Sequence, residues 1–419
     1  MKTAEVISIG DELTSGQRLD TNSQWISLQL GELGVRAMYH TTVADDLPAN
    51  IAVFRSAVER ADIVVASGGL GPTADDLTRD AVAHMAGVEL VLDETQLRAI
   101  EAMFSRRGRP MPERNRVQAL FPAGAVPIPN PNGTAPGIHL VVSRPNRSPC
   151  NLFCLPGVPA ELFEMWRQTV APAIAATMPE ARVIRHRRIK CYGVGESHLE
   201  AMMPELIART REPLVGITVS QATITLRITA SGADDEACRR AMEPTVREIY
   251  DTLGTIVFGE EDDELQHAVA RLLVQRGLTL ATAEWGSAGL IARWLGEVSQ
   301  GREHLAGGVV VASGHSAARL LGIDEALVAR HGDTGREVAT ALATACREKT
   351  GADLALATSN VPPIDPTASV PPKFHIAIAA STGVAVHAAR YAGHPDILKD
   401  RGGKDALNAL RLHLLAAAD

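Results

Sequence analysis

Short apolar runs alternate with amphipathic helical patterns in the first part of the chain. The runs AEVISI at 4–9 and DIVVA at 62–66 are each followed by glycine, which is typical of buried parallel strands. Between them, residues 22–33 and 48–60 repeat apolar side chains at helical spacing. This alternation predicts a doubly wound α/β sheet.

The same design returns further along the chain. Residues 76–87 form a helical pattern that ends at a glycine. The strand pattern NLFCL at 151–155 runs into the tight turn PGVP at 156–159, and a helix is expected from about Ala160. The sequence therefore predicts a doubly wound, three-layer α/β domain over residues 1–176.

A smaller α+β domain is predicted for residues 180–258. It begins with a strand near 186–192 and a helix, and it continues with two alternating strand patterns, GITVS at 216–220 and TITLRITA at 223–230. The acidic run EEDDE at 260–264 follows. We interpret this run as the solvated start of a helix.

From residue 265 onward, strands and helices alternate again, which predicts an α/β C-terminal domain over residues 262–419. Its strand patterns are TLATAE at 279–284, GGVVVA at 307–312, ADLALAT at 352–358 and FHIAIAA at 374–380. A long helical pattern precedes the third of these strands, and a Leu- and Ala-rich helical pattern ends the chain.

Composition favours a soluble, cytoplasmic protein. The net charge is -8 and no basic stripe is present, so we expect no nucleic-acid partner. The short basic segment RHRRIK at 185–190 either contacts phosphate or is a solvated strand. The five cysteines form no CxxC pair, which suits reduced thiols in a cytoplasm. No signal-peptide pattern opens the chain and no apolar run approaches the roughly 18 residues of a membrane span, so we expect no membrane association.

The glycines Gly68, Gly69 and Gly71 lie between the second strand and the helix that follows it. Backbone N–H groups in such a loop can approach a phosphate, and the helix dipole favours its charge. A tight turn also requires glycine, so the loop alone leaves both interpretations open. The adjacent Asp75 and Asp76 favour a phosphate site, because they supply the hard oxygen ligands that magnesium or a similar divalent ion prefers. Asp76 is equally well placed to cap the helix.

Other polar side chains follow the first strand, at the edge where ligands bind in open α/β sheets. These residues are Asp11, Glu12, Asp20 and Asn22. Each alone is compatible with solvation or N-capping, but their convergence favours a binding site. The loop NPNGTAPG at 130–137, which contains Thr134, either closes over a ligand or is a plain surface loop.

These segments resemble the competence/damage-inducible CinA family. The resemblance is carried by GDELTSGQRLDTNSQWISLQLGELG at 10–34, SGGLGPTADDLT at 67–78, GRPMPERNRVQALFPAGA at 108–125, NPNGTAPG at 130–137 and LPGVPAEL at 155–162. Together they cover most of residues 4–170. Several long motifs in the right order make the resemblance specific, and YGVGESHLE at 192–200 and ITLRITASG at 224–232 extend it to the middle domain.

The resemblance implies a molybdopterin-binding-like N-terminal domain that hydrolyses ADP-ribose to AMP and ribose 5-phosphate with a divalent metal ion. Under it, Asp75 and Asp76 hold the metal and form the catalytic set with Asp11. The substrate-binding residues would be Gly68, Gly69, Gly71, Thr73, Asn22, Thr134 and Gly157. The family also suggests a homodimer, and Lys190 in the middle domain is a candidate phosphate contact.

The C-terminal domain resembles the family's nicotinamide mononucleotide deamidase domain, but its site differs. Where the family has a nucleophilic serine in A-E-S-x-T-G-G, this chain reads AEWGSAGL at 283–290, with Trp285 at the position of that serine and Ser287 at that of the threonine. An indole cannot act as a nucleophile, and it fills the space that a substrate amide needs. The family's T-G-x-x-G-P loop is here TSNVPPIDPTASVPP at 358–372. Polar landmarks between these two segments are replaced by Ala312, Gly314 and Ala317.

These losses indicate a deamidase fold without the deamidase reaction, with Ser287 as a displaced nucleophile as the alternative. For the N-terminal domain three hypotheses remain. It is a metal-dependent ADP-ribose hydrolase, a different enzyme on the same fold such as one that transfers adenylyl groups to molybdopterin, or a non-catalytic nucleotide- or molybdopterin-binding regulatory protein. The continuous family segments favour the first.

Overall fold

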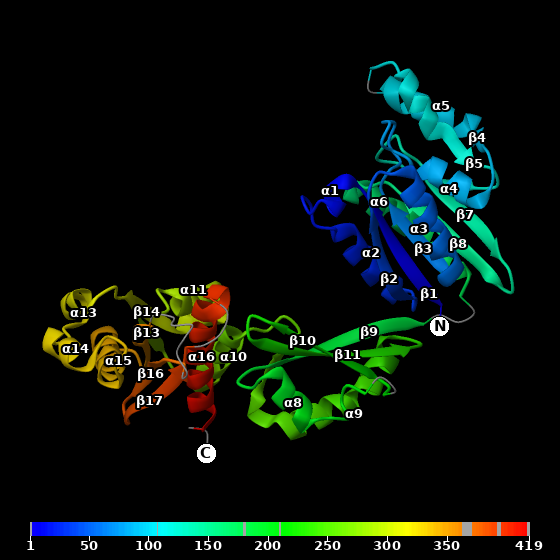
Figure 1. The fold of residues 1–419 in the computed structure, drawn as a ribbon. Coiled ribbons are helices and arrows are strands. Elements are labelled where there is room, and N and C mark those ends of the chain that lie inside the picture. Colours follow the sequence, from blue (N-terminus) through cyan, green and yellow to red (C-terminus); the bar gives the residue numbers. More distant parts are fainter. Residues whose placement is uncertain are drawn as a thin grey trace. The chain divides into compact units, whose positions relative to one another are not determined.

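The computed structural model describes residues 2–106, 108–178, 182–208, 211–362, 371–391 and 395–416. The chain divides into two compact units, Met1–Arg185 with Ala230–Ala241, and His186–Thr229 with Met242–Asp419. The first unit contains a six-stranded sheet and the second a five-stranded sheet (Figure 1).

A six-stranded mixed sheet forms the centre of the N-terminal domain. Its strands in spatial order are β2 (Arg36–Val43), β1 (Thr3–Ile9), β3 (Ile63–Ser67), β8 (Arg147–Leu155), β7 (Gly137–Arg144) and β6 (Val126–Ile128). The first four are parallel, and β7 and β6 continue the sheet through antiparallel pairs. Because the chain crosses from β1 outward to β2 and then back to β3, the sheet is doubly wound, as the sequence predicts.

Helices cover both faces of this sheet (Figure 1). The helices of this domain are α1 (Asp11–Thr14), α2 (Thr21–Glu32), α3 (Leu47–Arg60), α4 (Thr78–Ala86), α5 (Glu94–Arg106), α6 (Pro159–Met165) and α7 (Ala171–Ala176), with a 3-10 helix η1 (Glu113–Ala119) and a π-helical turn η2 (Trp166–Val170). Of these, α5 and η1 form a small core with each other. Successive side chains of β3 enter separate cores: Val65 packs with Leu30 of α2, and Val64 packs with Phe54 of α3. This confirms the three-layer prediction. A two-stranded sheet of β4 (Leu90–Leu92) and β5 (Leu120–Pro122) lies outside the main one.

No strand is predicted from the sequence at the position of β2. Only Val43 of this strand is buried, because β2 is the edge strand and most of its side chains face solvent. An edge strand of this kind lacks the continuous apolar run by which a central parallel strand is recognised. The start of α4 also differs, since the helix begins at Thr78 and not at Asp76.

The middle domain has a four-stranded sheet in the order β10 (Leu214–Ser220), β11 (Thr223–Gly232), β9 (Val183–Cys191) and β12 (Val257–Glu260). Its helices are α8 (Glu196–Met202), α9 (Asp235–Leu253) and the 3-10 turn η3 (Gly254–Ile256). The α+β class is as predicted. Neither α9 nor β12 is predicted from the sequence, and β12 determines the contacts of the charged segments described below.

The C-terminal domain is a second α/β layer structure. Its sheet has the order β14 (Leu305–Val310), β13 (Leu280–Glu284), β15 (Leu354–Thr358), β16 (Lys373–Ala380) and β17 (Gly383–Arg390), with the first three strands parallel. Its helices are α10 (Leu265–Arg276), α11 (Leu290–Glu297), α12 (Ser299–His304), α13 (Gly314–Leu321), α14 (Glu325–His331), α15 (Arg336–Thr350) and α16 (Pro395–Ala416). One face is leucine-rich, where Leu356 packs with Leu410 of α16, and the other is alanine-rich, where Ala355 packs with Leu342 of α15. In the described part of the chain, no helix has the length and apolar character needed to cross a membrane.

Candidate functional site

A cavity of about 590 Å³ opens at the carboxyl ends of β1, β3 and β8. Its walls are the turns that follow these strands, the start of α2 and the loop before β7, because parallel strands bring their following turns to one edge of a sheet. The predicted site residues that line it are Glu12, Asp20, Asn22, Gly68, Gly69, Gly71, Asp75, Asp76, Thr134 and Gly157. Three other candidates, Asp11, Thr73 and Lys190, are not among its lining residues.

Asp11 joins two turns to each other. Its Oδ1 accepts a hydrogen bond from the amide of Asp45 at 3.1 Å, and Oδ2 of Asp45 accepts one from the amide of Asp11 at 3.0 Å. Asp45 follows β2 and lines the cavity. Asp45 is not among the site residues predicted from the sequence, because the strand before it is not predicted either. The available signal is the acidic pair that begins two residues after Val43.

The glycines of the 68–71 turn are required by the turn itself. Gly68 has φ +114° and Gly69 has φ +64°, a region that L side chains rarely adopt. A Cβ on Gly68 would lie 2.4 Å from the carbonyl oxygen of Ile9, and one on Gly69 would lie 2.3 Å from Oγ1 of Thr78. The tight-turn interpretation is therefore sufficient to explain these two glycines, and a phosphate role needs separate evidence.

That evidence is two backbone amides of the turn that remain free. Oγ1 of Thr78 donates to the carbonyl of Gly68 at 2.8 Å, and the amide of Thr78 donates to the carbonyl of Gly69 at 3.2 Å. Because C=O and N–H of a trans peptide point in opposite directions, the N–H groups of Gly69 and Leu70 point away from α4. Among the described residues, neither amide has a hydrogen-bond acceptor, although both residues line the cavity. The turn thus offers two N–H groups to an anion.

Asp75 and Asp76 have different surroundings. Oδ1 of Asp76 accepts from the amide of Gly71 at 2.7 Å, and Oδ2 accepts from the amide of Thr73 at 2.9 Å and from the Thr73 hydroxyl. Asp76 therefore closes the turn before α4, and the helix-capping role considered for it is wrong, since its oxygens accept from Gly71 and Thr73 and not from the first amides of α4. Asp75 is exposed, and the neighbouring Thr73 hydroxyl and its own backbone lower the pKa of Asp75, which keeps it ionised.

The described lining of the cavity carries six carboxylates against one arginine. The carboxylates are Glu12, Asp20, Asp45, Asp75, Asp76 and Glu161, and the arginine is Arg18. Burial, reinforced by the negative charges of Asp11, Asp75 and Glu12, raises the pKa of Asp45. A cavity this negative repels a phosphate unless a cation accompanies it. The oxygen donors themselves fit a hard divalent ion.

The arrangement of these carboxylates limits how such an ion could be held. In the part of the chain that the structure describes, no group of three or more His, Cys, Asp or Glu side chains is arranged to hold a metal ion. Magnesium, however, commonly uses one or two carboxylates and takes its other ligands from water and substrate phosphates. The residues present fit that mode of binding and not an all-protein metal cage.

Asp20 secures the floor of the cavity. It accepts from the amide of Ser23 at 2.9 Å, which caps α2, and from the hydroxyl of Ser8 at 2.6 Å. Burial alone would raise the pKa of Asp20, but these hydrogen bonds hold it below the ordinary value. Asp20 is therefore an ionised acceptor facing the cavity, and it also has the N-capping role that the sequence left open.

Two amide side chains fasten the walls of the cavity. Nδ2 of Asn22 donates to Oγ of Ser67 at 3.0 Å and to the carbonyl of Gly157 at 2.9 Å, so it joins α2 to the turns after β3 and β8. Nδ2 of Asn130 donates to Oε2 of Glu161 at 2.6 Å. The loop before β7 is therefore held against α6 as a wall of the cavity and is not a plain surface loop.

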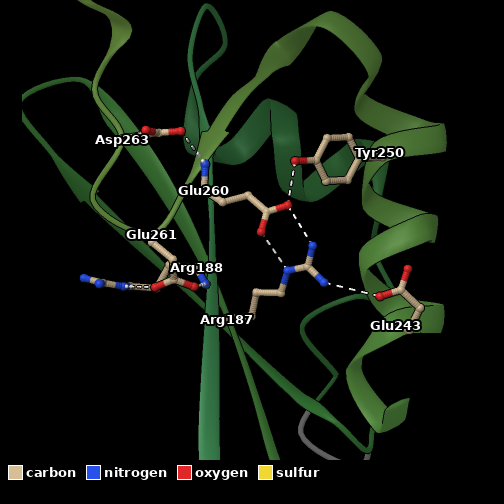
Figure 2. Close-up of polar contacts among 7 residues, drawn as sticks. All are labelled: Arg187, Arg188, Glu243, Tyr250, Glu260, Glu261 and Asp263. Atoms are coloured by element: carbon tan, nitrogen blue, oxygen red, sulfur yellow. Dashed lines mark hydrogen bonds and ion pairs between the residues drawn. The ribbon is translucent and has the colours of Figure 1, made fainter. Parts of the chain in front are cut away.

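Outside the cavity, the basic segment RHRRIK and the acidic run EEDDE pair with each other (Figure 2). Arg187 makes two hydrogen bonds to the Glu260 carboxylate, at 2.7 and 2.9 Å, and a third to Glu243 at 3.3 Å. Nε of Arg188 donates to Glu261 at 3.1 Å. The interpretation of the acidic run as a solvated helix start is wrong for its first residues, because β12 pairs antiparallel with β9 and brings the two segments together.

In the C-terminal domain, Trp285 belongs to the core. Its side chain lies in the cluster formed by the alanine-rich face of the sheet with α13 and α15, and the residue is 8% exposed. The small side chains Ala283 and Ala357 of neighbouring strands leave the volume that the indole occupies. The loop expected at 358–372 lies partly outside the described residues, which omit 363–370.

Ser287 is part of a helix cap. Its hydroxyl donates to Oε2 of Glu284 at 2.7 Å and lies 2.9 Å from Oγ1 of Thr358. The fully buried Glu284 carboxylate also accepts from the amides of Ile291 at 3.0 Å and Ala292 at 2.8 Å, so it caps α11. These contacts place Ser287 in a buried hydrogen-bond network in which the Glu284 carboxylate is also engaged by two amides of α11.

Comparisons with known proteins divide the chain into three domains. Residues 5–176 match the family profile "Probable molybdopterin binding domain", residues 186–259 match "Damage-inducible protein CinA KH domain", and residues 262–414 match "CinA C-terminal domain". A protein of Symbiobacterium thermophilum named as competence-damage inducible is 37% identical over 85% of this chain and 83% of its own. One of Bacillus subtilis is 33% identical over 96% of each chain, and a CinA-like protein of Frankia casuarinae is 34% identical over 97% of this chain and 95% of its own.

Proposed function

The chain belongs to the CinA family of competence-damage inducible proteins, and we propose that its N-terminal domain hydrolyses ADP-ribose to AMP and ribose 5-phosphate with a divalent metal ion. The observation that carries this proposal is the cavity in which two free backbone amides share the lining with six carboxylates. The amides suit phosphate oxygens and the carboxylates suit a cation, so a metal–pyrophosphate unit satisfies both. A volume of about 590 Å³ suits a ligand of this size.

The protein's own residues then have distinct roles. The N–H groups of Gly69 and Leu70 bind phosphate oxygens, and Asp75, exposed and ionised, provides a metal ligand with Asp76 beside it. Asp45 lines the cavity in the turn after β2 and is our candidate for taking a proton from the attacking water; burial and nearby negative charges raise its pKa. When bound, the metal ion polarises a phosphoryl oxygen and lowers the pKa of that water.

The test is AMP formation from ADP-ribose, measured with magnesium, with manganese and with a chelator. Asp75→Ala is expected to lower the rate by about a hundredfold or more, because a metal-ligand carboxylate acts directly on the reacting phosphate. Glu101→Ala is the matched control: Glu101 is an exposed carboxylate on α5 of the same domain and does not line the cavity. Wild-type protein that forms no AMP with either metal, or Asp75→Ala that retains the full rate, would overturn the proposal.

A non-catalytic protein that binds a nucleotide or molybdopterin is the second candidate. It is favoured by Asp76, whose two oxygens are already engaged by the turn. The family resemblance, which implies a nucleophilic serine at the position of the buried Trp285, also favours it. Calorimetric binding of ADP-ribose without AMP formation, unchanged by Asp75→Ala, would establish it. The match to a KH domain does not favour nucleic acid, because the G-x-x-G sequence by which KH domains clamp nucleotides is absent from residues 186–259.

A further inference from the structure

Two buried side chains at the first turn of α4 hold the carbonyl groups of the 68–71 turn. Thr78, fully buried, donates its hydroxyl to the carbonyl of Gly68 at 2.8 Å. Arg79, 3% exposed, donates from Nη2 to the carbonyl of Leu70 at 2.6 Å and from Nη1 to that of Gly71 at 3.3 Å. The amide of Thr78 donates to the carbonyl of Gly69, so the four successive carbonyls of residues 68–71 all point toward α4.

We propose that Thr78 and Arg79 are the positioning residues of the phosphate site: Thr78 binds the carbonyls of the two peptides whose N–H groups are free, and Arg79 binds the next two carbonyls and so fixes the turn that continues from them. This inference rests on the proposed function, since it assumes that the cavity binds a phosphate. Reversing the 68–69 or 69–70 peptide would replace an N–H by a carbonyl oxygen, which repels an anion. The buried donors of Thr78 and Arg79 therefore prevent a reversal that would abolish phosphate binding.

The surroundings of Arg79 support this role. No carboxylate lies within ion-pair distance of its guanidinium among the described residues, and its Nε has no hydrogen-bond partner. Burial lowers the pKa of Arg79 to about 10, against the nearby charges of Asp76 and Asp80, so it remains a cation at neutral pH. A buried cation without an ion pair is unfavourable for folding alone. Behind the free amides of a cavity rich in carboxylates, it supplies positive potential where a phosphate would bind.

The domain also contains a buried arginine that serves the fold alone. The Arg144 side chain is 4% exposed, and it donates to the carbonyls of Val58 at 3.3 Å and Ala61 at 2.8 Å. Unlike Arg79, it has an ion pair, with Asp62 at 2.9 Å. None of these residues lines the cavity. Arg144 is therefore a matched control for a buried guanidinium that holds backbone carbonyls.

The experiment compares Arg79→Lys with Arg144→Lys, and Thr78→Val with Thr78→Ser, in the full chain. Titration calorimetry with ADP-ribose and magnesium gives affinity, and the unfolding midpoint reports stability. Both lysine variants are expected to lower the midpoint, but only Arg79→Lys should weaken binding, by about tenfold or more, because it keeps the charge and loses the paired donors. Thr78→Ser should retain wild-type affinity, whereas Thr78→Val should lose about tenfold.

The outcomes separate this inference from the function on which it rests. Equal affinity of wild type, Arg79→Lys and Thr78→Val, measured well below their unfolding midpoints, would overturn the positioning role while leaving the phosphate site intact. Wild type that binds ADP-ribose but never forms AMP would overturn the hydrolase and still allow the comparison. Wild type that does not bind ADP-ribose would overturn both. The Thr78 pair keeps the test decisive if Arg79→Lys does not fold.

Discussion

Gly69→Ala tests whether the turn after β3 is built as described. The alanine at position 69 must adopt the backbone angle φ near +64°, which costs about 1 kcal/mol for a residue other than glycine. Its methyl group would also lie 2.3 Å from Oγ1 of Thr78, so the hydroxyl must leave the carbonyl of Gly68. A buried carbonyl left without its partner costs about 1–3 kcal/mol. We therefore expect a loss of about 2–4 kcal/mol in the free energy of unfolding of the N-terminal domain.

Gly157→Ala is the matched control. A Cβ on Gly157 meets only the Cα of Gly68, at 3.7 Å, and Gly157 is not among the glycines with positive φ. Its stability should be unchanged or higher by about 0.4–1 kcal/mol, because alanine restricts the unfolded chain. Gly157 lines the cavity, however, so the methyl group should weaken ADP-ribose binding without weakening the fold.

Differential scanning calorimetry measures both variants. For a domain of this size, 1 kcal/mol shifts the midpoint by about 2–4 °C, so Gly69→Ala should unfold roughly 5–15 °C below wild type. A Gly69→Ala midpoint within about 2 °C of wild type would refute the geometry assigned to the turn. A comparable decrease in the midpoint of Gly157→Ala would show that any added methyl group at this edge of the sheet destabilises the domain. The decrease for Gly69→Ala would then not be specific to its left-handed backbone and its close contact with Thr78.

Three further predictions concern other parts of the chain. Trp285→Ser creates a cavity in the core and should destabilise the C-terminal domain by about 3–5 kcal/mol. The variant should release no ammonia from nicotinamide mononucleotide. Ammonia release would show that the deamidase site is otherwise intact. The ion pair with Arg187 holds the pKa of Glu260 below its ordinary 4.5, so its stabilisation is complete above pH 4.5 and is lost as the pH falls through the lower folded-state pKa. Glu260→Gln should therefore cost about 1 kcal/mol at pH 7 and nothing in acid, in denaturant titrations at both pH values; an equal cost at both would exclude the ion pair as the cause. Asn130→Ala frees the wall loop from Glu161 and should weaken ADP-ribose binding severalfold by calorimetry, and an unchanged affinity would show that this loop does not contact the ligand.

The elements that the sequence predicts correctly are those whose environment is encoded locally. β3 and the last part of β8, residues 152–155, are buried on both faces and almost wholly apolar, β1 is mostly apolar, and helices such as α3 repeat apolar positions at helical spacing. The edge strand β2 has no such signal, because half of its environment is solvent. Because β2 is not predicted, Asp45 is not predicted as a site residue either. A residue can be assigned to an edge of the sheet only when the strand before it is recognised.

Charged segments show the same limit. The basic segment that contains Arg187 and the acidic run that begins at Glu260 are separated by about seventy residues, and each alone looks solvated. The antiparallel pairing of β9 with β12 turns them into one ion-pair network (Figure 2). Likewise, Asp76 beside a helix start has the appearance of a cap, and only the path of the turn shows that it accepts from Gly71 and Thr73.

By itself, then, the sequence determined the three-domain α/β organisation, the family and the turn at 67–78, because periodicity, glycine placement and long motifs are local properties of a chain. Only the tertiary structure decided which polar groups of that turn are free and which are engaged. The carbonyls are bound by Thr78 and Arg79, while the amides of Gly69 and Leu70 have no acceptor within the described parts of the chain. The reason is the orientation of the peptide groups in the turn. That orientation depends on the hydrogen-bond donors that the fold places next to the turn, and the spacing of residues along the chain does not specify it.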